Sequence, residues 1–332
     1  MTSINREIMF LYAENARSKI KDFALYLKKS PQRLKYTLKR MEKEALVTNP
    51  HVIFDYSYFG LILFRVYFKG GYIGEKDKAD IIKKLLENGY IVSLYELLGE
   101  YDLAIEIEAP NPSRFNKELK KVASLIPTLN KYKVILNLVT HLYPRFYLVP
   151  TSNLEMVPIS SEIIVGGDRV IGDFSDQEMK LMHYLLENPK TRMTFLAKNS
   201  QMNIKTAISL FKDLQKRKII RGFRYTLDNT ALGISKFRLF LRLHNLTADR
   251  EGKLLEYFKQ TKEIVQVNKT IGDWDMEVDI ESLDKARIRF LTMQLREEFK
   301  ELVEDFNLIE FCQIYKKSFL PSYLFKETEV QE

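Results

Sequence analysis

The sequence predicts an α+β protein in which one helix- and strand-forming unit is repeated in tandem. The segment GEYDLAIEIE, residues 99–108, returns as GDWDMEVDIE at residues 272–281. The same offset relates Asp55 to Asp228 and holds without a gap from about residue 5 to about residue 145. Each copy begins with apolar residues at helical spacing and continues with alternating strands. The chain is therefore expected to be an internal duplication.

The first third of each copy, residues 1–54 and 175–227, is predicted to be a winged helix-turn-helix. Two short helical segments lead into SPQRLKYTLKRMEKEALV, in which Ser30 can cap a helix and Pro31 takes its first position. Apolar residues recur along that helix at i, i+4 and i+7 and leave a basic face opposite them. The second copy keeps this plan with Asn203 as the cap. The following segments, ALVTNPHVIFD and KIIRGFRYTLD, are expected to form a short two-stranded wing.

The rest of each copy, residues 55–146 and 228–320, is predicted to be a ferredoxin-like α+β sandwich domain. Its βαββαβ pattern includes the strand LAIEIEA, which alternates as expected for a sheet with one wet face. Residues 147–174 between the copies have no counterpart and are predicted to be a linker, in which EIIVGGDRVIGD allows a hairpin around its glycines. Residues 321–332 are predicted to be a tail.

Composition favours a cytoplasmic protein with folded domains. Of the 332 residues, 45% are hydrophobic, but no apolar run approaches the roughly 20 residues of a membrane helix. The N-terminus lacks the layout of a signal peptide, and the single cysteine, Cys312, excludes an intrachain disulfide. The net charge of +8 is concentrated in the two predicted winged domains, and the remainder is acidic. This segregation suggests a polyanion-binding module joined to a different one.

The order and spacing of these elements resemble the Lrp/AsnC family of transcriptional regulators, in a tandem duplicated form. The resemblance rests on LKKSPQRLKYTLKRMEKEALV with GEYDLAIEI and on NSQMNIKTAISLFKDLQKRKII with GDWDMEVDI, and it covers nearly the whole chain. It implies sequence-specific binding of double-stranded DNA by the winged helices. It also implies α+β domains that self-associate and often sense an amino acid or another small-molecule effector. Family members usually carry one copy and pair as dimers, so we hypothesise an intrachain pseudo-dimer of α+β domains or a higher oligomer.

This resemblance assigns DNA contacts to the capped helix of each copy. Arg33 has the donor geometry for guanine and Gln32 has the geometry for adenine, while other basic side chains neutralise phosphates. Arg40 is matched by Asp213 in the second copy, so the two DNA half-sites are expected to differ. The predicted DNA-binding set is Gln32, Arg33, Lys35, Tyr36, Lys39, Arg40, Lys43, Lys205, Thr206, Ser209, Lys212 and Lys216. An amphipathic helix whose charges only face solvent would show the same pattern.

The repeated G-x-x-D element has two interpretations. As a structural element, its glycine adopts a positive φ in a hairpin and its aspartate accepts hydrogen bonds from amides of that turn. The family resemblance instead implies an effector-binding loop formed by Gly99, Tyr101, Asp102, Gly272, Trp274 and Asp275. Arg65 and Arg238 also recur, each inside an apolar strand. A solvated or salt-bridged arginine and a carboxylate-binding arginine both fit that position.

The sequence shows no catalytic or metal-binding pattern, so it predicts a protein that is not an enzyme and that uses no cofactor or metal. The four histidines are scattered, and a glycine-rich phosphate loop is absent. An enzyme alternative remains, because siroheme decarboxylases are similar in architecture. A His-Asn-Tyr-like element is expected there on the strand before the hairpin, whereas VSLYELLGEYD and VQVNKTIGDWD contain no histidine. A nucleoid-associated protein of low sequence specificity is a third alternative.

Overall fold

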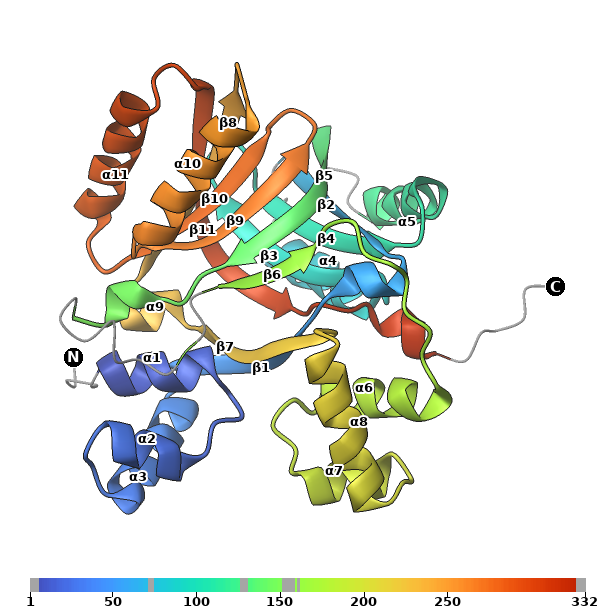
Figure 1. Cartoon of the computed structure of the whole chain (residues 1–332). Helices are drawn as coiled ribbons and strands as arrows, with labels where there is room; N and C mark the ends of the chain where they lie inside the picture. The colour runs from blue at the N-terminus through green and yellow to red at the C-terminus, as the bar shows by residue number, and fades with distance from the viewer. Residues whose placement is uncertain (1–5, 71–74, 126–130, 151–158, 160–161, 327–332) are drawn as a thin grey trace. The chain divides into compact units, whose positions relative to one another are not determined.

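The computed structural model describes residues 6–70, 75–125, 131–150, 159 and 162–326, and Figure 1 shows its ribbon. The chain divides into two compact units, each built from non-contiguous segments. Unit 1 contains residues 1–50, 138–164 and 224–311, and unit 2 contains residues 51–137, 165–223 and 312–332. Each unit therefore combines the helix-turn-helix of one copy with most of the α+β sandwich of the other copy.

The first helix-turn-helix belongs to unit 1. It consists of α1 (Arg6–Glu14), α2 (Ile20–Tyr26) and α3 (Pro31–Lys43). The side chain of Ser30 caps α3 by accepting a hydrogen bond from the backbone amide of Arg33. The predicted apolar stripe of Leu34, Leu38 and Met41 is buried, and the basic residues between these positions face outward.

The second helix-turn-helix belongs to unit 2. It consists of α6 (Asp176–Glu187), α7 (Met193–Asn199) and α8 (Ile204–Lys216). Ser175 and Glu178 form a capping box at the start of α6, and the predicted cap Asn203 accepts a hydrogen bond from the amide of Lys205. The strands that follow the two motifs, β1 (Val47–Phe54) and β7 (Ile220–Leu227), pair with each other in a two-stranded sheet. Each copy therefore contributes one strand to this sheet.

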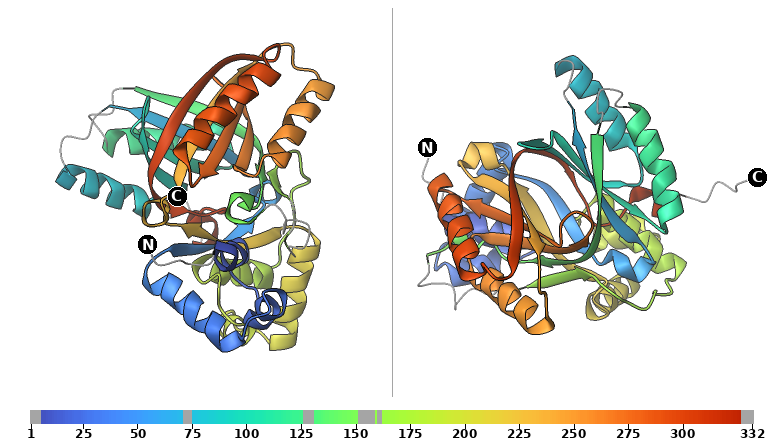
Figure 2. Two further views of the ribbon diagram at one scale, coloured as in Figure 1. Left: turned by 90° about the vertical axis from the view of Figure 1, so that its left-hand side faces the viewer. Right: turned by 90° about the horizontal axis from the view of Figure 1, so that it is seen from above.

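The first α+β sandwich lies mainly in unit 2. Its elements are β2 (Ile62–Lys69), α4 (Glu75–Glu87), β3 (Ile91–Leu98), β4 (Leu103–Ala109), α5 (Pro112–Leu125) and β5 (Lys131–Leu142). The antiparallel strand order is β5-β2-β4-β3. Helices α4 and α5 cover one face of the sheet, as Figure 2 shows, over a core that includes Val66, Ile105 and Leu119.

The second sandwich lies mainly in unit 1 and repeats this topology. Its elements are β8 (Ser235–Leu243), α10 (Ala248–Gln260), β9 (Ile264–Ile271), β10 (Met276–Ser282), α11 (Lys285–Glu298) and β11 (Val303–Lys317). The antiparallel order is β11-β8-β10-β9, and α10 and α11 cover one face over Leu239, Val278 and Leu291. The predicted α+β fold, with two copies of a winged helix-turn-helix and a ferredoxin-like domain, is confirmed.

The face of each sheet that carries no helices is polar yet buried. Strand alternation directs Met276, Val278 and Ile280 toward the helices of unit 1, so the residues between them point to the opposite face. The acidic residues on these opposite faces are Glu106, Glu108, Glu277, Asp279 and Glu281, and each is at most 3% exposed. The alternation of the strands predicted a wet face, and that prediction is wrong.

A repeated aspartate and glycine frame a short helical turn before the first strand of each sandwich. Asp55 caps η1 (Tyr56–Phe59) and Asp228 caps α9 (Asn229–Leu232), by accepting backbone hydrogen bonds. Gly60 and Gly233 end these turns at φ 66°, in the left-handed region that glycine adopts without a Cβ clash. The turn therefore explains why these residues recur at the constant offset.

The segment between the copies forms less structure than its glycines suggested. It contains η2 (Phe146–Leu148) and β6 (Ile163–Gly166), and no second strand follows Gly167 in the described residues 168–174, so the expected hairpin is not formed. Residues 151–158 and 160–161 lie outside the described part. In the predicted tail, η4 (Ser322–Phe325) is helical. Among the helices described, none combines the length and the apolarity needed to cross a membrane.

Asp55 provides a test of a buried polar junction in unit 2. Its carboxylate accepts hydrogen bonds from Ser57 Oγ at 2.6 Å, Gly166 N at 2.9 Å and Arg221 Nη2 at 2.8 Å. Asp55→Ala is expected to destabilise the protein by on the order of 3 kcal/mol, because it leaves a half-buried guanidinium without its carboxylate. Urea denaturation of the full chain measures this change.

Asp228→Ala is the matched control, since it removes the same residue from the other copy. Asp228 is more exposed, and it caps α9 through the amide of Ala231 at 2.8 Å. Its loss is expected to cost about 1 kcal/mol, the usual value of a helix cap. Equal losses for the two variants would contradict the junction described for Asp55.

Candidate functional site

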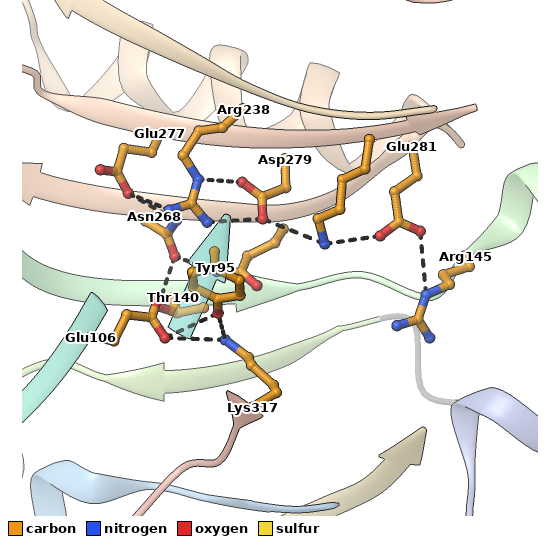
Figure 3. Close-up of polar contacts among 12 residues, drawn as sticks. Tyr95, Glu106, Thr140, Arg145, Arg238, Asn268, Glu277, Asp279, Glu281 and Lys317 are labelled. Atoms are coloured by element: carbon orange, nitrogen blue, oxygen red, sulfur yellow. Dashed lines mark hydrogen bonds and ion pairs between the residues drawn. The ribbon is translucent and has the colours of Figure 1, made fainter. Parts of the chain in front are cut away.

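A buried guanidinium–carboxylate pair lies at the centre of the polar face in unit 1. Arg238 on β8 stands opposite Asp279 on β10 in the register of the sheet. The Nε and Nη2 atoms of Arg238 donate to the two carboxylate oxygens of Asp279 at 2.6 and 2.9 Å (Figure 3). Glu277 lies 3.6 Å from Nη1 of the same guanidinium. This bidentate geometry fixes both side chains.

The cluster in unit 1 continues through neutral hydrogen-bonding groups. Asn268 on β9 donates from Nδ2 to Glu277 Oε2 at 3.3 Å. Its Oδ1 atom accepts from Thr140 Oγ1 and from Gln266 Nε2, each at 2.9 Å. All four side chains are buried. Such a connected polar network holds its members in one arrangement.

Glu281 is a carboxylate of unit 1 that three groups hold. Lys236 Nζ donates to its Oε1 at 3.0 Å, Tyr147 Oη donates to its Oε2 at 2.8 Å, and Arg145 Nε forms an ion pair at 3.4 Å. Burial opposes ionisation, but attraction to Lys236 and Arg145 outweighs it and lowers the pKa of Glu281 to about 2. Glu281 is therefore an anion throughout the neutral range.

Arg145 connects this polar face to the first helix-turn-helix within unit 1. Its Nη1 donates to Glu14 Oε1 at 2.7 Å, and Glu14 lies at the end of α1. The other oxygen of Glu14 forms an ion pair with Arg224 of β7 at 2.8 Å. A line of charged contacts therefore runs from the strand β10 to the helix α1.

The corresponding face of unit 2 has its own pair, Arg65 with Glu106. Arg65 Nε donates to Glu106 Oε1 at 2.9 Å, again between residues in cross-strand register. Lys317 at the end of β11 donates to Tyr95 Oη at 2.8 Å and to Glu106 Oε2 at 3.3 Å (Figure 3). Burial favours a neutral Lys317, but attraction to Glu106 and to Tyr95 raises its pKa. The lysine is therefore a buried ammonium.

Glu108 differs from every other carboxylate on these two faces. It is 1% exposed, and its Oε2 atom has no hydrogen-bond partner among the residues that the structure describes. Burial, and then repulsion by Glu106 two residues earlier on the same face of β4, raise the pKa of Glu108 well above its usual range. These surroundings therefore favour the neutral acid over the carboxylate at Glu108. Its equivalent in the second copy is Glu281, for which the direction is opposite.

The residues predicted to bind DNA lie on the solvent-facing sides of α3 and α8. Arg40 and Thr206 are partly exposed, and the other members of the set are exposed. They do not take part in the buried clusters of either unit. The amphipathic pattern thus predicted their exposure correctly, and an exposed basic face is also what a solvated helix shows.

The G-x-x-D element forms a hairpin, but its aspartate does not bind the amides of that hairpin's own turn, as was expected. It binds an amide at the end of a neighbouring strand instead. Gly99 and Gly272 have φ values of 130° and 148°. The carboxylate of Asp102 accepts from the amide of Gly70 at 2.8 Å, and that of Asp275 accepts from the amide of Leu243 at 2.8 Å. Gly70 directly follows the end of β2, and Leu243 is the last residue of β8. The hairpin of each copy folds back beside that strand, so its aspartate reaches the amide at the strand's end. The aspartate therefore joins two strand ends within its own sheet.

The aromatic residues of this element are packed inside the sheets. The ring of Tyr101 lies 5.1 Å from that of Tyr67, and the ring of Trp274 lies 5.6 Å from that of Phe240. Both side chains are buried. An effector-binding role for this loop stays a prediction.

Arg65 and Arg238 were recognisable in the sequence, whereas the groups around them were not. The salt-bridged interpretation of these arginines is confirmed, and the solvated one is wrong because both are at most 1% exposed. The repeated acids of IEIEA and VDIES were a signal for paired carboxylates on one face. Lys317 and Arg145 carried no such signal. Lys317 is the last residue of β11 and Arg145 follows β5, and both bind residues that are far away in sequence.

No protein-family model matches this sequence, and no curated protein matches it either. Among solved structures, the crystal structure of the siroheme decarboxylase NirDL is similar with a TM-score of 0.58 at 12% identity, covering 98% of this chain and 97% of that chain. NirDL in co-complex with an iron-uroporphyrin III analogue has the same TM-score and identity over 97% of each chain. An AsnC family transcriptional regulator from Agrobacterium tumefaciens covers 43% of this chain, with a TM-score of 0.38 at 14% identity over 93% of its own length.

These comparisons correct two predictions made from the sequence. The chain has an Lrp/AsnC-like fold in tandem, as the resemblance implied. The predictions of a sequence-specific DNA-binding regulator and of a chain that is not an enzyme are wrong, because the match that spans both copies is to an enzyme. A capped basic helix after a tight turn belongs to the fold and does not distinguish the two classes. Self-association through the α+β domains stays a prediction.

The ionised state of Glu281 leads to a prediction about pH. Glu281→Gln is expected to lower the stability at pH 7 by on the order of 3 kcal/mol, because the buried cations lose a carboxylate. The pKa in the folded chain is about 2 against a usual 4.5, so the stabilisation is present above pH 4.5 and is lost as the pH falls toward 2. Urea midpoints measured from pH 2 to pH 7 should therefore draw together for variant and wild type as the pH falls below 4.5.

Glu304→Gln is the control for this experiment. Glu304 is an exposed carboxylate on β11 of the same unit, and its replacement is expected to leave the midpoints unchanged within about 0.5 kcal/mol at each pH. A gap between Glu281→Gln and wild type that stays constant over the whole pH range would show that ionisation of Glu281 is not its cause.

Proposed function

We propose that the chain is a decarboxylase that removes a carboxylate group from a tetrapyrrole of the siroheme type. The observation that carries the proposal is the similarity in fold to the siroheme decarboxylase NirDL over the whole chain. That protein has also been solved with an iron-uroporphyrin III analogue, a macrocycle that carries several carboxylates. The buried ionic clusters of this chain give the proposal independent support.

Loss of carbon dioxide without oxidation makes three demands on the protein. The bond between the substrate carbon and its carboxyl carbon breaks, carbon dioxide leaves, and the electron pair that stays on the substrate carbon takes up one proton. The protein must hold the carboxylates of the substrate, keep bulk water from the reacting carbon and deliver that proton. No electron acceptor is needed, because the electron pair remains on the substrate.

Lys317 in unit 2 and Lys236 in unit 1 suit the first of these roles. Each ammonium lies on the helix-free face of its sheet, within 3.3 Å of a carboxylate oxygen. Attraction between opposite charges is much stronger in such a buried place than in water. A carboxylate of the substrate can therefore replace the resident carboxylate as a partner without leaving the ammonium uncompensated.

The histidine expected on the strand before the hairpin of a siroheme decarboxylase is absent, so this chain requires another proton donor. Neither strand before the repeated hairpin carries a histidine, and at the equivalent positions β3 carries Tyr95 and β9 carries Asn268. An amide does not serve as an acid at neutral pH, whereas a phenol or a neutral carboxyl does. Unit 2 holds both kinds of group in Tyr95 and Glu108, which makes its polar face the better candidate for the reaction.

Siroheme is the substrate with which to test this proposal. Mixed anaerobically with the full chain, siroheme is expected to change its absorption spectrum on binding. Mass spectrometry of the extracted macrocycle is then expected to show a loss of the mass of carbon dioxide. Lys317→Met is expected to weaken binding by about tenfold or more, since a buried charge partner is worth more than about 1.4 kcal/mol.

Lys120→Met serves as the control, because Lys120 is an exposed lysine on α5, on the other side of the same sheet. It is expected to bind and react like wild type. A wild-type chain with a native circular dichroism spectrum that neither binds siroheme nor releases carbon dioxide from it would contradict the proposed function.

A further inference from the structure

Glu108 occupies a position at which the two copies keep the same side chain in opposite states. Glu281, its equivalent, is held by Lys236, Arg145 and Tyr147. The constant offset places Leu63 at the position equivalent to Lys236 and Ser318 at the position equivalent to Arg145, whereas Tyr147 lies in the segment that has no counterpart. Neither replacement is a cation or an acid. Glu108 thus retains the carboxyl group of Glu281 but has no equivalent of Lys236 or Arg145, the two cations that hold Glu281 as an anion.

The register of the sheets makes this comparison exact for the nearest neighbour. Leu63 on β2 stands opposite Glu108 on β4, just as Lys236 on β8 stands opposite Glu281 on β10. Directly opposed residues of antiparallel strands are in side-chain contact. The residue at this one cross-strand position therefore determines whether the glutamate faces an ammonium or an aliphatic side chain.

The charged groups that face Glu108 come from several elements of unit 2, and most of them oppose its ionisation. Glu106 on the same strand and Asp55 after β1 repel a negative charge there. Lys317 attracts it, but this ammonium already donates to Tyr95 and Glu106. Tyr56 and Tyr323 contribute hydroxyl groups and no positive charge. A neutral carboxyl is the state that this surrounding favours.

A second buried donor accompanies Glu108. Tyr323 on η4 is held by a ring stack on Tyr90, with 3.8 Å between the ring centroids, and its hydroxyl is coupled electrostatically to Glu108. Tyr323 Oη, like Glu108 Oε2, is buried with no hydrogen-bond partner among the described residues. A buried donor without an acceptor is energetically unfavourable. Two such donors suit an acceptor brought by a ligand, and a carboxylate is the strongest acceptor that the proposed substrate carries.

We propose that Glu108 is the acid that protonates the substrate carbon during decarboxylation and that Tyr323 orients the departing carboxylate, an inference that rests on the proposed function. The bond to the carboxyl carbon breaks, carbon dioxide leaves, and the remaining electron pair takes the proton of the Glu108 carboxyl. Glu108 is left as a carboxylate and regains its proton from solvent. The step involves no net oxidation or reduction.

The test compares kcat, KM and siroheme affinity for wild type, Glu108→Gln and Glu118→Gln. Glutamine has nearly the shape of a neutral glutamic acid, so Glu108→Gln is expected to keep the melting temperature and the siroheme affinity while kcat falls by about 10²–10⁴-fold. Wild-type kcat is expected to fall as the pH rises through the raised pKa of Glu108, and the residual rate of Glu108→Gln should lack this limb. Glu118 is equally buried but lies on α5 and pairs with Lys121, so Glu118→Gln should keep the wild-type kcat and pH profile.

Leu63→Lys is the complementary variant, since it gives Glu108 the ammonium that Lys236 gives Glu281. It is expected to move the descending limb of the pH profile to lower pH and to reduce kcat at neutral pH with Glu108 still present. Active wild type together with an equally active Glu108→Gln would overturn the role of Glu108 and leave the proposed function standing. A wild type that binds no siroheme and releases no carbon dioxide would overturn both.

Discussion

A buried guanidinium in each sheet is the constraint on which the polar architecture of this protein depends. An arginine side chain cannot give up its charge inside a protein, and an uncompensated buried charge is strongly destabilising. Arg238 and Arg65 therefore require a carboxylate at the cross-strand position, and Asp279 and Glu106 supply it. Those acids in turn attract the ammonium groups of Lys236 and Lys317. The charged groups on the helix-free face of each sheet are therefore a consequence of one buried arginine in each copy.

The two copies meet this constraint differently, and among the acidic residues of the helix-free faces only Glu108 of unit 2 has a buried carboxyl oxygen without a hydrogen bond to the described residues. In unit 1 the guanidinium binds Asp279 through two nitrogens, and Glu277 and Asn268 extend the network. In unit 2 alanine stands where the second copy has Glu277, and tyrosine stands where it has Asn268. The first network ties up its polar groups, whereas the second leaves the neutral carboxyl of Glu108 unengaged by hydrogen bonds at Oε2. Under the proposed function, duplication of one fold lets one copy support structure while the other carries the chemistry.

The sequence predicted what depends on neighbours along the chain. Helical periodicity placed Leu34, Leu38 and Met41 under α3, and cap chemistry placed Ser30 and Asn203 correctly. The βαββαβ order followed from alternation. What the sequence did not predict depends on contacts distant in sequence. A sheet with helices on one face looks half-exposed from its pattern, so the burial of the other face was missed. The union of one helix-turn-helix with the sandwich of the other copy was missed for the same reason.

The error about function has a related physical origin. Basic side chains on α3 and α8 form a visible sequence signal because they are consecutive on one exposed helix face. Lys317, Tyr95 and Glu106 form a more informative group, but Lys317 lies 222 residues from Tyr95 and 211 residues from Glu106 in sequence, so the three meet only in the folded unit. An exposed charge is inexpensive and is consistent with many functions. A charge buried on a sheet face is costly, so its surroundings discriminate between functions far better than the charge of a helix surface. The residue opposite a buried acid, leucine at position 63 or lysine at position 236, is therefore the more telling sign of what each copy can do.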